Sequence, residues 1–385
     1  MMYIDILLRL GAVANSLSIS ASEIVLGLLI LLAIYKTYKT RDYSVFKKGF
    51  FLFFLLMIVA ETISTFAGID PERSMKGFTT WWVLLYLPAI YIVFQGRDRV
   101  KYFVYVFLGA VIASVYGVYE LLNGDVRRAD GFFSHALTYG NVIALVAIAA
   151  FGVLLYRLYE TKNHFYITSV TLVLTIVALL VSGSRGPILA FIITAFMVFI
   201  FRFKVKGFIT GILLLIILVS VAYKVPHIQQ RFINIADNAK VTTSSVGTRL
   251  VLWEASSRAI MLRPFFGYGK NNFRDNIGEF IDVPTSSRAH AHNSYIQYTY
   301  LHGFFGLFAM LGFLGSILWE IKRKMRDNPF MKVAMSVIVV FMLEGLTENN
   351  FTDSEVAIMC FSLVGMMLAP RRSESIPDDS AELAT

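Results

Sequence analysis

The stretch His290–Leu311, HAHNSYIQYTYLHGFFGLFAML, places polar side chains that could do chemistry directly before an apolar segment. His292 and Asn293 stand at the entry of that segment, and His302 follows ten residues after His292. Histidine side chains accept and release protons near neutral pH, which suits general acid–base catalysis. The simpler interpretation is that His292 caps or hydrogen-bonds the start of a helix. Both roles are open at this point.

The histidine spacing gives little support for a metal site. His290 and His292 would share one face of a strand, but at the start of a helix their side chains diverge. The chain contains neither an HExxH nor a CxxC motif. We therefore expect no metal and no cofactor.

Three arginines in other connecting segments have the chemistry to bind an anion. Arg185 lies in SGSRGP between two apolar stretches, Arg249 in GTRLVLW, and Arg128 in RRADGFFSHALTYGN. A guanidinium group offers a planar fork of donors that matches phosphate oxygens. Simpler interpretations are a snorkelling helix-end side chain at Arg185, a solvated helix face or a cation–π pair with Trp253 at Arg249, and an ordinary charged loop around Arg128.

The composition is that of a membrane protein. Of the 385 residues, 57% are hydrophobic and only 16% are charged, whereas soluble domains have about 25% charged residues. The apolar residues form blocks near the ~20 residues that cross a bilayer. The formal charge of +9 is better explained by cytoplasmic lysines and arginines than by a nucleic-acid partner. The single cysteine, Cys360, excludes an intrachain disulfide.

The expected fold class is an all-α polytopic membrane protein with about twelve transmembrane helices and one large, partly helical outer loop. The predicted spans are residues 4–18, 22–38, 49–68, 79–95, 100–122, 137–158, 164–182, 187–203, 207–224, 295–319, 330–346 and 352–369. The first of these is short and carries charged residues, so it could span the bilayer or lie at its surface. The predicted units are nine helices in 1–224, the loop 225–294, three helices in 295–369 and a polar tail, 370–385.

The connecting segments predict the orientation. Every second one is dense in lysine and arginine, as in GRDRVK and KRKMRDNPFMK, and such segments face the cytoplasm. Both termini are then cytoplasmic, and the segments that carry the candidate residues face the opposite side.

The large loop should contain an ordered helix near the outer membrane surface. SSVGTRLVLWEASSRAIML begins with capping-type residues, has an apolar stripe at Leu252, Ala255, Ala259 and Leu262, and stops before Pro264. We expect Arg258 to pair with Glu254, four residues earlier.

Taken together, HNSYIQYTYLHGFFG, SGSRG, GTRLVLW and RPFFGYGKNNF resemble the signature segments of the O-antigen ligase family. The resemblance extends to the layout, with about twelve spans and a large loop before the tenth. The wider superfamily includes O-antigen polymerases and pilin-type oligosaccharyltransferases.

The resemblance implies a glycosyltransferase of the inner membrane with its site facing the periplasm. Its donor would be a glycan linked to undecaprenyl diphosphate, and its acceptor lipid A–core. In this interpretation His292 is the general base, and Arg185 and Arg249 hold the diphosphate without a metal. Arg128 and Asn293 are further substrate-binding candidates.

Two other functions fit less well. A polymerase of the same superfamily would use a second lipid-linked glycan as the acceptor. A transporter of polyprenyl-linked glycans would place polar groups near the membrane midplane, whereas the charged candidates here gather at one face. Glu61 and Glu120, near the outer ends of predicted spans, are ambiguous.

Overall fold

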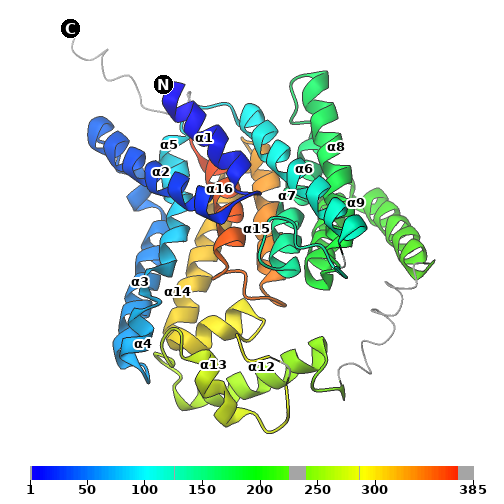
Figure 1. Cartoon of the computed structure of the whole chain (residues 1–385). Helices are drawn as coiled ribbons and strands as arrows, with labels where there is room; N and C mark the ends of the chain where they lie inside the picture. The colour runs from blue at the N-terminus through cyan, green and yellow to red at the C-terminus, as the bar shows by residue number, and fades with distance from the viewer. Residues whose placement is uncertain (1, 125, 225–239, 286, 372–385) are drawn as a thin grey trace, which may run out of the picture.

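The computed structural model describes residues 2–124, 126–224, 240–285 and 287–371, and the regular elements in these ranges are helices (Figure 1). In chain order they are α1 (Met2–Ala14), α2 (Ile19–Thr40), η1 (Ser44–Lys47), α3 (Gly49–Ala67), α4 (Pro71–Met75), η2 (Phe78–Leu85), α5 (Tyr86–Val93), α6 (Arg99–Asn123), α7 (Ala136–Leu155), α8 (Lys162–Val181), α9 (Arg185–Lys224), α12 (Ser245–Leu262), α13 (Phe273–Asn276), η3 (Ile277–Phe280), α14 (Ser294–Lys324), α15 (Phe330–Glu344) and α16 (Ser354–Leu368). The all-α fold class is confirmed.

Among the described residues, seven helices are long and apolar enough to cross a bilayer: α2, α3, α6, α7, α8, the Arg185–Ile209 part of α9, and α14. The chain is therefore a multi-pass membrane protein. The 13 residues of α1 and the 15 of α15 and of α16 rise only about 20–22 Å, less than the ~30 Å of hydrocarbon. Twelve complete crossings stay a prediction.

The centre of the bundle is formed by α7 and α16, whose side chains are buried on nearly every face. α7 packs against α8, α9, α15 and α16 (Figure 1). At one end of the bundle, α7 lies beside the α6–α7, α8–α9 and α15–α16 connections. The Thr138 hydroxyl at the start of α7 donates to the Asp353 carboxylate at 2.7 Å, and Arg128 donates to the Ser184 hydroxyl at 2.7 Å.

Two long helices are interrupted. α9 has a non-helical backbone at Lys204, with φ 53° and ψ −128°, at the place where the sequence predicts a basic connection between two spans. α14 is interrupted at Gly303, with φ 67° and ψ −172°, and its part before Gly303 turns away from the axis of the part after it (Figure 1).

The interruption of α14 is filled by residues 264–269 of the large loop. Four backbone hydrogen bonds join the two: Tyr268 N–H to Tyr300 O (3.0 Å), Gly269 N–H to Leu301 O (2.9 Å), Phe304 N–H to Pro264 O (2.7 Å) and Phe305 N–H to Phe265 O (3.4 Å). Backbone groups in or near a bilayer need such internal partners. The resembling segments RPFFGYG and YLHGFFG thus pair with each other.

Gly303→Ala is expected to lower thermal stability because the position has both a left-handed φ and no room. A Cβ there would lie 2.2 Å from the Phe265 carbonyl carbon, and strained backbone of this kind costs about 1–3 kcal/mol. Gly315→Ala, in the same helix, is the matched control, since a Cβ there meets nothing within 4 Å. Equal melting temperatures of the two purified variants would contradict this account.

The described part of the large loop folds on its own apolar cluster, which includes side chains from the start of α14. Its buried members are Leu252, Ala255, Ala259, Ile260, Tyr268, Phe273, Ile277, Ala291, Tyr300 and Leu301. The predicted helix is confirmed as α12, and the Ser244 hydroxyl caps it by accepting from Gly247 N–H at 3.0 Å.

Two details of α12 differ from expectation. Leu262 is 70% exposed rather than part of the buried stripe, because the helix ends at this residue. Arg258 forms its salt bridge with Asp282, at 2.6 Å, rather than with Glu254, because the chain after α13 folds back beside the helix. Residues 225–239 and 372–385 lie outside the described residues, so the start of the large loop and the extent of the tail stay predictions.

Candidate functional site

Asn293 caps the start of α14. Its side-chain oxygen accepts from the N–H groups of Tyr295 and Ile296, both at 3.0 Å, and its amide nitrogen donates to the Leu346 carbonyl at 3.0 Å. The capping role considered for His292 therefore belongs to Asn293. These bonds occupy the Asn293 amide, and its role in substrate binding stays a prediction.

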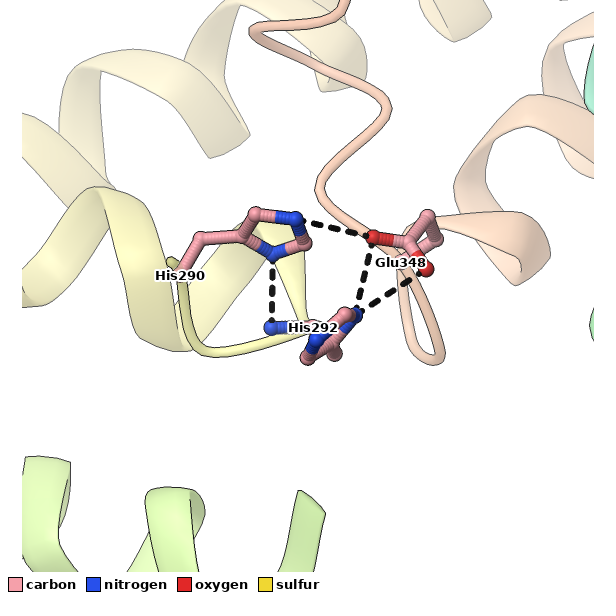
Figure 2. A group of neighbouring side chains, drawn as sticks. All are labelled: His290, His292 and Glu348. Atoms are coloured by element: carbon pink, nitrogen blue, oxygen red, sulfur yellow. Dashed lines mark hydrogen bonds and ion pairs between the residues drawn. The ribbon is translucent and has the colours of Figure 1, made fainter. Parts of the chain in front are cut away.

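His292 lies just before the cap and faces the connection between α15 and α16. Its φ of 49° is left-handed, so the chain turns sharply and directs the ring toward Glu348. His292 Nδ1 lies 3.1 and 3.2 Å from the two carboxylate oxygens of Glu348. His290 Nε2 lies 3.5 Å from the same carboxylate, and Figure 2 shows both rings converging on it. The prediction that the side chains of His290 and His292 diverge is wrong.

The hydrogen bonds indicate which ring nitrogens carry protons. His290 Nδ1 accepts the backbone N–H of His292 at 3.1 Å, and an accepting ring nitrogen has a lone pair and no proton. The neutral His290 ring therefore carries its proton on Nε2, toward Glu348. His292 turns Nδ1 to Glu348, which places the proton there and leaves a lone pair on Nε2. His292 Nε2 is then available as a base.

The same three residues also have the types found in metal sites, with ligand atoms within 4.8 Å of one another. A metal on His290 Nε2 would require its proton to move to Nδ1, where the His292 N–H already points. Arg249 adds a positive charge 3.6 Å from Glu348. The geometry therefore favours a hydrogen-bonded triad of His290, His292 and Glu348.

Glu348 is fixed by neighbouring backbone and hydroxyl groups. The Asn349 N–H donates to its carboxylate at 3.1 Å, and the Ser294 hydroxyl donates to its carbonyl at 3.0 Å. Burial would raise the pKa of Glu348, but the hydrogen bond and charge of His292, together with His290, bring it to about 2. Glu348 is therefore ionised at neutral pH.

His290 is neutral at neutral pH. Burial, the largest influence, lowers its pKa to about 4, although Glu348 opposes this shift. The nearby charges of His292, Arg249 and His135 act in the same direction as burial. Of the two histidines, His290 is therefore suited to hold Glu348 and the backbone in place.

A pocket of about 190 Å³ opens beside Glu348 and brings the three predicted arginines together. Its polar lining comprises Arg128, Arg185, Arg249, Ser184, Ser245, Thr347 and Glu348. One carboxylate against three guanidinium groups leaves the pocket positive. A multiply charged anion such as a diphosphate fits this balance.

The SGSRGP segment is shaped by its glycines. Gly183 has a φ of 58°, which glycine adopts without strain. At Gly186 a Cβ would lie 2.3 Å from the Thr347 hydroxyl oxygen, so only glycine lets the start of α9 approach the α15–α16 connection this closely. Arg185 is placed between these two glycines, at the wall of the pocket.

The contacts of Arg249 and Arg128 differ from those that their simpler interpretations predict. Arg249 lies beside Glu348 and donates to the Ser245 hydroxyl at 3.2 Å, whereas the Trp253 indole donates to the Ala291 carbonyl at 2.8 Å. Arg128 donates to the Ser182 carbonyl at 2.9 Å and to Ser184. Arg128 thus belongs to the pocket rather than to a plain charged loop.

Other polar groups near the break in α14 have different partners. His302 Nδ1 lies 2.7 Å from the Ser64 hydroxyl, and Lys270 pairs with Glu61 at 3.3 Å. These contacts fasten α14 and the large loop to α3, and they include no member of the triad.

Sequence reasoning missed Glu348 and the structural role of His290. Glu348 lies in TENNFTDSE, a segment of the predicted outer face. The signal that could have identified Glu348 is that it is an acidic residue predicted on the same face as the candidate histidine base.

Comparison with known proteins points to one family. Residues 170–311 match the family model described as O-antigen ligase. The matched region runs from α8 past the break in α14, and it contains Arg185, Arg249, His290 and His292, while Arg128 and Glu348 lie outside it. No curated protein matches the chain. This part of the chain is therefore similar to the O-antigen ligase family, whose superfamily comprises glycosyltransferase-like ligases and polymerases.

Proposed function

We propose that the protein joins an O-antigen glycan, carried on undecaprenyl diphosphate, to lipid A–core at the periplasmic face of the inner membrane. The observation that carries the proposal is the shared position of Glu348: it hydrogen-bonds His292 and also lines the pocket of Arg128, Arg185 and Arg249. His292 and the arginine pocket thus lie side by side, which supports a base acting next to a bound diphosphate. Lipid-linked glycan donors and lipid acceptors are the substrates that the family implies in general.

The chemistry follows from these positions. His292 Nε2 takes the proton of an acceptor sugar hydroxyl, and the hydroxyl oxygen forms a bond to the anomeric carbon of the glycan. The bond from that carbon to the diphosphate oxygen breaks, and its electron pair leaves with undecaprenyl diphosphate. Arg185, Arg249 and Arg128 stabilise the negative charge that develops there. The ionised Glu348 stabilises the protonated His292 ring.

The acceptor distinguishes a ligase from a polymerase, and a gel of lipopolysaccharide from a deletion strain tests it. Bare lipid A–core together with accumulated full-length lipid-linked polymer is the expected result. Core that bears a single repeat unit would overturn the proposal in favour of a polymerase.

The proposal requires the pocket to face the periplasm. Cysteine introduced at Ser244, which caps α12, should react with a membrane-impermeant thiol reagent in intact cells, in a background with Cys360 replaced. Cysteine at Ser373 should stay protected, because the basic segments predict a cytoplasmic tail. Labelling of the Ser373 variant from outside would contradict the assigned sides.

Glu348→Gln should lower transfer by at least about 10–100-fold, the effect known for removing a hydrogen-bond partner that orients a metal-binding histidine. An amide can donate to His292 Nδ1 and so stabilise the tautomer with the proton on Nε2, the wrong one for a base. The loss should appear in kcat rather than KM. Glu348→Asp, which keeps the charge, should recover part of the activity.

The matched control is Glu254→Gln, an exposed carboxylate of α12 outside the pocket lining. Its kinetics should resemble those of the unmodified protein. Full activity of Glu348→Gln would remove Glu348 from the mechanism.

A further inference from the structure

Residues 261–266, MLRPFF, form an exposed apolar segment at the end of α12. Met261 is 72% exposed, Leu262 70% and Phe265 71%. Three large apolar side chains in six residues are costly to leave in water, and such patches mark contact with a protein or a membrane.

The segment is attached to the end of α3. The Arg263 guanidinium donates to the Ala67 carbonyl at 3.2 Å, and Ala67 is the last residue of that helix. The 19 residues of α3 rise about 28 Å, close to the ~30 Å thickness of the hydrocarbon layer. The other end of α3 is marked by the ion pair of Lys48 with Glu320 of α14, at 3.4 Å.

The segment is also attached to α14, at the same level. The backbone of Pro264 and Phe265 accepts hydrogen bonds from Phe304 and Phe305, directly after the break at Gly303. From Gly303 to Glu320, α14 rises about 26 Å. The Lys48–Glu320 pair thus marks the same end of α3 and α14, and residues 261–266 are attached at the opposite end of both helices. Because each helix is nearly as long as the hydrocarbon layer is thick, the segment lies at the hydrocarbon boundary on the side of the arginine pocket.

Exposed apolar side chains also lie on the two helices to which the segment is attached. Phe66 near the end of α3 is 66% exposed, and Phe308 of α14 is 60% exposed. Since α3 and α14 are membrane-spanning candidates, these side chains face lipid. Arg263, which lies over the Tyr268 ring at 5.6 Å, has the amphipathic surroundings typical of a headgroup-level residue.

We propose that residues 261–266 are a membrane anchor, in which Met261, Leu262 and Phe265 insert into the lipid leaflet on the side of the arginine pocket. The anchor fixes the end of α12 to the membrane surface, while the start of the same helix carries Arg249 into the pocket. The occupant of this surface is lipid acyl chain, because the segment is attached to the ends of α3 and α14, which are both membrane-spanning candidates.

Site-specific fluorescence quenching in lipid nanodiscs tests the anchor. The full chain with Cys360→Ala receives Leu262→Cys or Phe265→Cys, each labelled with a bimane fluorophore. Ser257→Cys is the aqueous control, since Ser257 is exposed on the same helix, and Phe308→Cys is the lipid control. If Cys360→Ala lowers the melting temperature, Cys360 is retained, because its complete burial shields it from brief labelling.

The anchor predicts that Leu262 and Phe265 behave like Phe308. Lipids with a nitroxide on the acyl chain should quench both several-fold more than Ser257, and aqueous iodide should quench both several-fold less. Quenching by iodide to the level of Ser257 would overturn the proposal by placing the segment in water. Protection from both quenchers would equally overturn it, because protein rather than lipid would then cover the segment.

Discussion

His292→Ala is expected to lower the rate of glycan transfer by about 10²–10⁴-fold, the usual contribution of a general base. The fold and donor binding should survive, because Asn293 rather than His292 caps α14 and the arginine pocket keeps its lining. Purified variant and unmodified protein are compared in transfer rate, donor affinity and melting temperature.

Two variants refine this result. His292→Asn retains a polar group without a titratable nitrogen and should be as inactive as His292→Ala. His290→Asn should lose less activity, because the neutral His290 supports Glu348 and does not present the free lone pair. Near-normal transfer by His292→Asn at matched stability would move the base to another residue.

Arg185→Lys and Arg249→Lys should each reduce transfer by roughly 10²–10³-fold, the range for loss of a donor to developing negative charge. Lysine keeps the positive charge but loses the planar fork that binds two phosphate oxygens at once. At position 249 the substitution also disturbs the contact with Glu348. Initial rates with a polyprenyl-diphosphate-linked donor measure the effect.

Arg258→Lys is the matched control, since Arg258 lies on the same helix as Arg249 but pairs with Asp282 outside the pocket. It should transfer glycan at the unmodified rate. Wild-type activity of both pocket variants would show that bidentate recognition by these arginines is wrong. Strong inhibition by EDTA, reversed by one divalent ion, would show that a metal takes part.

The helices were the most predictable feature, whereas the sequence singles out the arginines one by one and does not place them in one pocket. Apolar blocks separated by basic segments predict the helices, because bilayer thickness dictates the length of such blocks. They also predict the break at Lys204 inside α9. Arg185 and Arg249 stand out in the sequence because the positive-inside rule disfavours arginine on the outer face, while Arg128 is only a further candidate there. Periodicity and capping residues predicted α12.

The triad could not be predicted in full, because its geometry depends on contacts between distant segments. Glu348 is 56 positions from His292, and no local pattern specifies that approach. The convergence of His290 and His292 depends on the left-handed backbone at His292, which sequence periodicity does not reveal. The pairing of Arg258 with Asp282 and the exposure of Leu262 likewise follow from how the large loop folds back.

The proposed function of the arginine pocket and His292 is transfer of a lipid-linked glycan to lipid A–core. Its most direct test is reconstitution of the purified chain in liposomes with undecaprenyl-diphosphate-linked glycan and lipid A–core, without nucleotide. The expected products are glycan-bearing lipid A–core and an equal amount of released undecaprenyl diphosphate, and both should be lost with His292→Ala. Unmodified core accompanied by longer lipid-linked glycan would contradict it.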